Sequence, residues 1–142
     1  MAKVKDILAT KGNEVCSIEP DASVYDAMKR MAEKGIGALL VMEGTKVVGV
    51  ISERDYARKV ILQGRASRST RVREIMTSHV LYAEPDQNIE ECMALMTEKR
   101  VRHLPVMAGG QVIGVISIGD LVKSIITEQK FIIEQLERYI SG

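Results

Sequence analysis

The sequence is short of the features that nucleic-acid binders need. It has no tryptophan and a single phenylalanine among its 142 residues, which argues against an aromatic platform for stacking bases. Its 20 basic and 19 acidic residues leave a formal net charge of +1, so the basic excess of a dedicated nucleic-acid binder is missing. These two shortages predict that nucleic acid is not a partner.

Long apolar runs and cysteine clusters are missing as well. The longest uncharged apolar run, IGALLVM at 36–42, is too short to span a membrane. The start, MAKVKDILATKGNE, reaches charged residues too early for a signal peptide. The only cysteines, Cys16 and Cys92, have neither metal nor redox spacing and are expected as small buried side chains. We therefore expect no membrane partner, no metal site and a cytoplasmic location.

Catalytic motifs are the last notable absence. The sequence has no Cys–His or Ser–His–Asp arrangement in a recognisable context and no Gly-x-x-x-x-Gly-Lys phosphate loop. We expect no catalytic residues and no enzyme activity. What remains is a chain with 46% hydrophobic and 27% charged residues, which suffices for a packed core.

The chain contains an internal repeat of two copies. Pro20-Asp21 recurs as Pro85-Asp86 at a spacing of 65 residues (85 − 20 = 65), and GVISERD at 49–55 recurs at the same spacing as GVISIGD at 114–120. The preceding stretches VKDIL at 4–8 and VREIM at 72–76 lie 68 residues apart, so the first copy has three extra residues near Lys11. The repeat predicts a first domain at 1–64, a linker at 65–71, a second domain at 72–128 and a helical tail at 129–142.

Each copy shows the same order of elements. A short lead-in helix precedes a β-branched run, VCSIEP or VLYAEP, and then a helix with Ser23 or Asn88 as its N-cap. Two β runs around a glycine-bearing turn follow as a hairpin, and Asp55 or Asp120 opens the next helix. This pattern predicts an α+β fold of two βαββα units, packed as a pseudo-twofold pair because neither sheet can bury both faces alone.

Two polar or amphipathic segments lie outside the repeated elements. The arginines of the linker region are most simply a solvated surface, with contact to a bound anion as the alternative: Arg65, Arg68, Arg71 and Arg73. In the tail, apolar residues recur at alternating steps of three and four, with Gln129 as the one polar member: Val122, Ile125, Gln129, Ile132, Leu136 and Tyr139. This spacing is typical of a coiled-coil seam and predicts self-association; folding back onto its own sheet is the alternative.

The duplicated pattern Gly-x-Ile-Ser-x-x-Asp has two interpretations. A serine at a strand end and an aspartate in the first helical turn are typical capping residues. However, Gly49 and Gly114 lie inside β-rich runs, where glycine weakens a strand unless something approaches the backbone closely. A carboxylate at a sheet edge can accept both hydroxyls of a ribose, and a helix N-terminus can hold phosphate. The pattern is therefore compatible with capping, with nucleotide binding, or with both.

The order of these motifs resembles a tandem pair of CBS (cystathionine-β-synthase) domains over about residues 3 to 128. The resemblance rests on the duplicated βαββα unit, the Pro-Asp after each first strand, RHLPVM at 102–107 and the paired GVIS-x-x-D turns. It implies two clefts between the paired sheets, which in many members bind AMP, ADP, ATP, NAD or S-adenosylmethionine. It also implies that Asp55 and Asp120 accept ribose hydroxyls, with Ser52 and Ser117 beside the ribose and phosphate.

The resemblance further implies unequal phosphate recognition in the two copies. The second copy has Arg102-His103 where the first has Gly37-Ala38, and Arg54 in the first copy matches Gly119 in the second. Guanidinium groups suit phosphate through their forked donors. For Arg102 the alternative is an ion pair with Glu98, four residues earlier, and for His103 it is a satisfied polar residue at a strand end. Thr77 is a weaker candidate for the adenine end of a cleft, and His79 is expected at the surface.

The leading hypothesis is a non-enzymatic module that senses an adenosine nucleotide, with AMP favoured over NAD or ATP, and signals in trans to an unidentified effector protein. The alternative is a structural interaction module whose clefts are empty. CBS pairs commonly form dimers, and together with the tail seam this predicts a homodimer.

Overall fold

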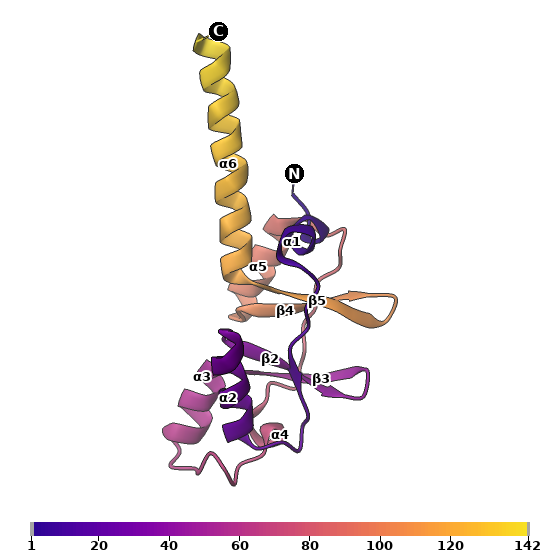
Figure 1. The fold of residues 1–142 in the computed structure, drawn as a ribbon, viewed down its shortest axis with the longest axis vertical. Coiled ribbons are helices and arrows are strands. Elements are labelled where there is room, and N and C mark those ends of the chain that lie inside the picture. Colours follow the sequence, from indigo (N-terminus) through magenta and orange to yellow (C-terminus); the bar gives the residue numbers. More distant parts are fainter. Residues whose placement is uncertain (1, 142) are drawn as a thin grey trace. The chain divides into compact units, whose positions relative to one another are not determined.

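The computed structural model describes residues 2–141, and side chains for residues 2–140. The chain forms two compact units. The central unit is Val15–Leu81, whereas the split unit joins the N-terminal segment up to Glu14 with the chain from Tyr82 onward. The two-repeat α+β fold with a long C-terminal helix is confirmed (Figure 1).

The central unit contains a three-stranded sheet in the order β1-β2-β3. Strand β1 is parallel to β2, and β2 and β3 form the predicted antiparallel hairpin. Ser23 caps helix α2 by accepting a hydrogen bond from the Asp26 backbone N–H at 3.0 Å, as predicted. Its elements are β1 (Ser17–Ile18), α2 (Val24–Lys34), β2 (Ala38–Glu43), β3 (Lys46–Ser52), α3 (Glu53–Tyr56), a π-helical turn (Ala57–Ile61) and α4 (Val72–Ile75).

The split unit repeats this arrangement with its own hairpin. Strands β4 and β5 are antiparallel, and Asn88 caps α5 by accepting from the Glu91 backbone N–H at 2.8 Å. Its elements are α1 (Val4–Lys11), α5 (Ile89–Lys99), β4 (His103–Ala108), β5 (Gln111–Ser117) and α6 (Ile118–Ser141).

Both cores use equivalent positions of the repeat. In the central unit Val24, Met31 and Leu39 are buried; in the split unit their counterparts 65 residues later are buried too: Ile89, Met96 and Leu104. The predicted burial of cysteine holds for Cys92, where burial raises the pKa of the thiol, whereas Cys16 is only half-buried.

The first strand of the second copy is shorter than predicted. VLYAEP forms a single parallel bridge, between Ala83 and Val106, instead of a strand. In the central unit the Leu40 backbone N–H donates to the Cys16 carbonyl at 3.1 Å. The residue equivalent to Leu40 is Pro105, which has no N–H and cannot make this ladder bond.

The lead-in helices are exchanged between the copies. The backbone N–H groups of Val4 and Lys5, at the start of α1, donate to the carbonyls of Gln87 and Pro85 in the second copy. Val72 and Arg73, at the start of α4, donate in the same way to Ala22 and Pro20. The free N–H groups of each lead-in are thus satisfied by the Pro-Asp turn of the other copy. The described residues up to Glu14 therefore lie in the same compact unit as the second copy.

The predicted linker 65–71 packs within the central unit. Thr70 is buried there, and its carbonyl accepts from the Val24 backbone N–H at 2.8 Å. The arginines of this region are engaged with surface groups of the same unit rather than lying free: Arg65 with Glu74 at 2.6 Å, Arg73 with Asp21 at 2.7 Å, Arg71 with Asp21 at 3.6 Å, and Arg68 over the Tyr25 ring at 4.0 Å.

Helix α6 extends well past the strands β4 and β5 of its own unit (Figure 1). Leu121 near its start is fully buried, but every described side chain from Gln129 to Ile140 is exposed. The alternative in which the tail folds back onto its own sheet is therefore wrong.

Candidate functional site

The strand-to-helix corner of the central unit is a reciprocal cap. Strand β3 ends at Ser52, whose backbone N–H donates to Asp55 Oδ2 at 2.9 Å and whose hydroxyl lies 3.1 Å from the same oxygen. In return, the Asp55 backbone N–H donates to Ser52 Oγ at 3.3 Å. The capping interpretation of Ser52 and Asp55 is confirmed.

The corner of the split unit has the same geometry. The Ser117 backbone N–H donates to Asp120 Oδ2 at 2.8 Å, and the Asp120 backbone N–H donates to Ser117 Oγ at 3.2 Å. The repeated sequence pattern thus folds into two repeated corners, each with a carboxylate held in place at a helix start.

Each carboxylate also lies beside a lysine. Lys59 Nζ is 3.2 Å from Asp55 Oδ1 and donates to the Ile75 carbonyl at 2.9 Å. Lys11 Nζ donates to Asp120 Oδ2 at 2.7 Å and to the Val115 carbonyl at 2.8 Å. The two lysines are not equivalents in the repeat, because the residue 65 positions after Lys59 is a serine. A comparison of the two copies therefore identified neither lysine as a partner of the carboxylates. The sequence feature that set Lys11 apart was its place at the three-residue insertion.

The pKa of Asp120 reflects this environment. Burial alone would raise the pKa, but the hydrogen bonds from Lys11 and from the Ser117 backbone, with the Lys11 charge, outweigh burial and lower it. Asp120 is thus held as a carboxylate, which is the acceptor form that hydroxyl recognition needs.

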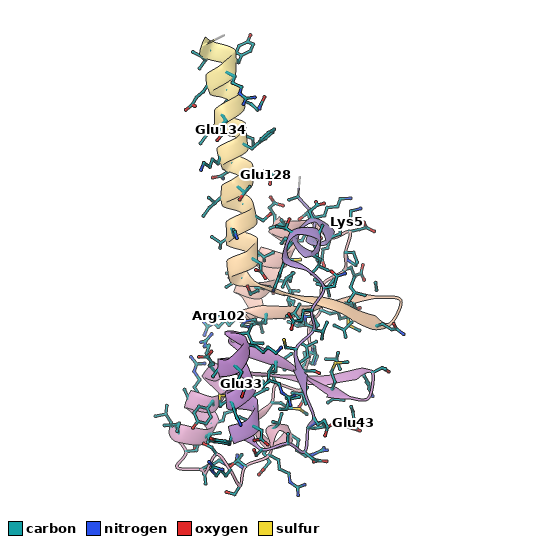
Figure 2. The ribbon with its side chains drawn as sticks, in the orientation of Figure 1. Lys5, Glu33, Glu43, Arg102, Glu128 and Glu134 are labelled. Carbon is teal, nitrogen blue, oxygen red and sulfur yellow. The ribbon has the colours of Figure 1, made fainter. Side chains whose placement is uncertain are left out.

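Basic candidates lie at the same ends of the strands. Arg102 directly precedes β4 and its carbonyl accepts from the Ile118 backbone N–H at 2.9 Å, while His103 is opposite Ser117 in the ladder. Figure 2 shows Arg102 at the base of α6. Within the residues described for its unit, the Arg102 guanidinium makes no ion pair, so the alternative pairing with Glu98 is not formed. The structure thus gathers Arg102, His103, Ser117 and Asp120 at one corner.

Arg54 and Thr77 lie at the other corner. Arg54 immediately precedes Asp55 and is exposed. Thr77 exchanges two backbone hydrogen bonds with Val50 of β3, at 3.0 and 2.9 Å, so it extends the edge of the sheet two residues before Ser52. His79 is exposed, as predicted.

The glycines of the pattern are explained by packing. A Cβ atom on Gly49 would lie 2.6 Å from Met76 Sδ and 3.0 Å from the Thr77 carbonyl oxygen. Gly114 is approached in the same way by Leu8, which is equivalent to Met76 in the repeat. The close approach expected at these glycines is therefore made by the exchanged lead-ins.

Comparison with known proteins identifies the repeat. The profile of the CBS domain matches residues 4–61 and 72–127. This chain belongs to the CBS-domain family. The mitochondrial CBS-domain protein CBSX3 of Arabidopsis thaliana is 38% identical over 150 residues, covering 98% of this chain and 72% of the relative.

Solved CBS structures match most of the chain. A CBS-domain protein of Burkholderia ambifaria, assigned to signal transduction, is 57% identical with a TM-score of 0.87, covering 90% of this chain and 96% of that one. The CBS pair of protein MJ0100, solved with 5′-methylthioadenosine and S-adenosyl-L-methionine, is 25% identical with a TM-score of 0.80, covering 90% and 98%.

Two other expectations concern metals and membranes. Among residues 2–141 of this CBS pair, no group of three or more His, Cys, Asp or Glu side chains is arranged to hold a metal ion. In the same described range, no helix is long and apolar enough to cross a membrane.

Proposed function

We propose that this CBS pair binds an adenosine nucleotide, with Asp55 and Asp120 accepting the ribose hydroxyls. The observation that carries the proposal is the duplicated corner, in which a serine fixes each carboxylate at a helix start. A carboxylate offers about four acceptor sites, so the hydrogen bonds inside each corner leave acceptor capacity for a diol. The Asp55 and Asp120 side chains are 14% and 24% exposed, which leaves them reachable from solvent.

The phosphate would lie near the basic groups of the corners. Arg54 serves the Asp55 corner together with Ser52, and Thr77 is the candidate for the adenine end. Arg102 and His103 serve the Asp120 corner together with Ser117. AMP is the favoured ligand, with NAD and ATP as the alternatives. The adenosyl compounds bound to the CBS pair of MJ0100 support this ligand class.

The output of the module is regulatory. Ligand binding would favour one of two conformations, and an effector protein that prefers this conformation would read it in trans. The assignment of the Burkholderia ambifaria relative to signal transduction supports this role. A non-enzymatic, cytoplasmic module remains the prediction; the location of CBSX3 in mitochondria concerns that relative.

Calorimetry with AMP, ATP, NAD and S-adenosylmethionine tests the ligand proposal. Asp55→Asn and Asp120→Asn keep a capping oxygen but remove the charge that a diol would meet. A lost charge-assisted contact of about 1.5–3 kcal/mol would weaken binding at that corner by roughly 10- to 150-fold. Glu74→Gln is the matched control, because Glu74 accepts from the Arg71 backbone N–H in the same capping role at α4. Full binding by the double Asn variant, or no binding of any of the four compounds, would contradict the proposal.

A second proposal concerns assembly, and the exposed face of α6 favours it. We infer that α6 pairs with α6 of a second copy, in parallel and in register. The seam positions Ile132, Leu136 and Tyr139 are 50%, 57% and 86% exposed. A neighbouring row of isoleucines widens the apolar face: Ile126, Ile133 and Ile140.

The seam itself argues for a second copy rather than another partner. No seam position between Val122 and Tyr139 is charged, because the acidic residues of this stretch of α6 occupy other positions: Glu128, Glu134 and Glu137. A parallel in-register pair places Gln129 opposite Gln129 of the second copy, whereas an antiparallel pair places it opposite an apolar residue. At about 60–120 Å² per buried apolar side chain, the exposed residues supply several hundred Å² per copy, against about 800 Å² in a standard interface.

Light scattering on the full chain tests this pairing. The wild type should be a dimer at micromolar concentration, and Ile132→Asp should shift it to monomer because the seam cannot bury a charge. Thr127→Asp is the control, since it adds the same charge on the opposite side of the helix. A wild-type monomer, or equal behaviour of the two variants, would exclude the role of the seam. If the dimer persists while no adenosine compound binds, the interaction module with empty clefts replaces the sensor.

A further inference from the structure

Lys11 connects three parts of the split unit through one ammonium group. It is the last residue of α1, and its Nζ reaches Asp120 in the first turn of α6 and the Val115 carbonyl in β5. Both distances are short, 2.7 and 2.8 Å, although the residues are more than a hundred positions apart in the sequence. The Lys11 side chain is 40% exposed, so it is accessible to solvent at this corner.

The lysine at the other corner is held differently. Lys59 follows Asp55 by four residues in the same helical segment, and its distance to the carboxylate is longer, 3.2 Å. It therefore accompanies Asp55 in any movement of that segment. Lys11 instead comes from a separate element, so the Lys11–Asp120 pair fastens the end of α1 to the start of α6.

The Lys11 ammonium and a ribose would need the same carboxylate. Asp120 Oδ2 already accepts from the Ser117 backbone N–H, and Lys11 adds a charged donor to the same oxygen. An ammonium on this oxygen neutralises its charge and fills its remaining acceptor direction. A diol that donates one hydroxyl to each oxygen of Asp120 must therefore displace Lys11 from Oδ2.

We propose that Lys11 is an internal competitor for the ligand at Asp120, and that ligand binding there releases the end of α1. The proposal rests on the proposed function, because it takes Asp120 to be the ribose acceptor. The two corners would then differ in their response to ligand. Binding at Asp120 requires the end of α1 to detach, whereas binding at Asp55 requires no separate element to move. The released lysine is followed directly by Gly12, and the chain leaves the split unit after Glu14. Ligand binding at this corner would thereby loosen the chain from Gly12 to Glu14, which connects the split unit to the central unit.

Calorimetry with adenosine tests the competition. Adenosine carries the ribose but no phosphate, so loss of the Lys11 charge cannot weaken an ionic contact with this probe. Lys11→Met keeps most of the apolar stem and should tighten adenosine binding about tenfold, which corresponds to one charge-assisted contact of about 1.4 kcal/mol. Asp120→Asn in the Lys11→Met background should remove this gain. Lys5→Met, on the same helix and in a solvent-exposed pair with Asp86, should bind as the wild type does.

Amide hydrogen exchange gives a second measurement on the same proteins. Adenosine or AMP should accelerate exchange of the Gly12 amide, which donates to the Leu8 carbonyl at 2.8 Å, whereas in Lys11→Met this amide should exchange fast without ligand. Unchanged or weaker adenosine binding by Lys11→Met, or Gly12 exchange that ligand does not alter, would overturn the competition while leaving the nucleotide-binding proposal intact. Absence of binding of every adenosine compound to wild type and variant alike would overturn both.

Discussion

Gly114 lies directly against Leu8, so the lead-in helix of the first copy rests on a strand of the second. A Cβ atom at Gly114 would lie 2.7 Å from Leu8 Cδ2 and 3.1 Å from Cδ1, closer than packed atoms approach. Gly49 has the same relationship to Met76. The glycine repeated in GVIS is therefore the position at which each copy receives the lead-in of the other.

Gly114→Ala should destabilise the protein by about 1–3 kcal/mol, because the added methyl group forces Leu8 or the strand to move. Gly49→Ala should act similarly, since its neighbours include the backbone oxygen of Thr77. Urea unfolding monitored by circular dichroism measures the change.

Gly119→Ala is the matched control for these variants. Its added Cβ would meet nothing closer than Ser117 Oγ at 3.6 Å, an ordinary contact, and alanine favours the first turn of α6. Leu8→Ala combined with Gly114→Ala should cost less than the two single variants added together, because the smaller side chain leaves room for the methyl group. Additive costs would show that Gly114 and Leu8 are not coupled.

Much of this fold was predictable because the two copies could be compared residue by residue. The hairpins, the caps at Ser23 and Asn88, and the corners at Asp55 and Asp120 all follow from patterns that occur twice. The exchange of lead-ins was not predictable, because the lead-in sequences of the two copies are alike. Each has the same pattern whether its helix packs on its own copy or on the other.

The shortened strand and the lysine contacts were missed for a different reason. Pro105 removes one ladder bond, but the surrounding RHLPVM stretch still has the hydrophobic pattern of a strand. Lys11 and Lys59 reach their carboxylates from non-equivalent positions, so a comparison of the copies finds no conserved pair. Such contacts depend on where elements lie in space rather than on repeated residues.

Pro105→Leu should restore the missing ladder bond, since it places the counterpart of Leu40 in the second copy. The new backbone N–H would occupy the ladder position from which Leu40 donates to the Cys16 carbonyl in the central unit. The new bond contributes about 0.5–1.5 kcal/mol, and loss of the proline costs about 0.4–1 kcal/mol through the unfolded chain, so net stability should change little. Hydrogen exchange should find the amide at 105 protected, with Leu40 as the internal reference. Exchange as fast as that of an exposed amide would contradict the explanation of the shortened strand.

Stability should depend on pH through Asp120. Because the folded state lowers its pKa below the usual 3.8, ionised Asp120 contributes stability that is complete above this value and is lost as the pH falls through the lowered pKa. Asp120→Asn should therefore be less stable than the wild type near neutral pH, and the difference should shrink in acid. Urea unfolding at several pH values measures this difference. Asp86→Asn, at an exposed ion pair, should show a small difference at every pH; a constant difference for Asp120→Asn would contradict the role of its charge.

Gln129→Leu tests whether the tail seam has a defined register. If α6 pairs with a second copy, Gln129 is the only polar side chain at the seam, and its partner is the same residue of the other helix. Leucine should stabilise the assembly, raising the thermal midpoint at a fixed protein concentration, and should also permit shifted or larger assemblies. Analytical ultracentrifugation should then resolve more than one species, against one for the wild type. Thr127→Leu, which adds an apolar residue away from the seam, should leave both quantities unchanged, and a similar response of the two variants would mean that Gln129 does not lie in the helix interface.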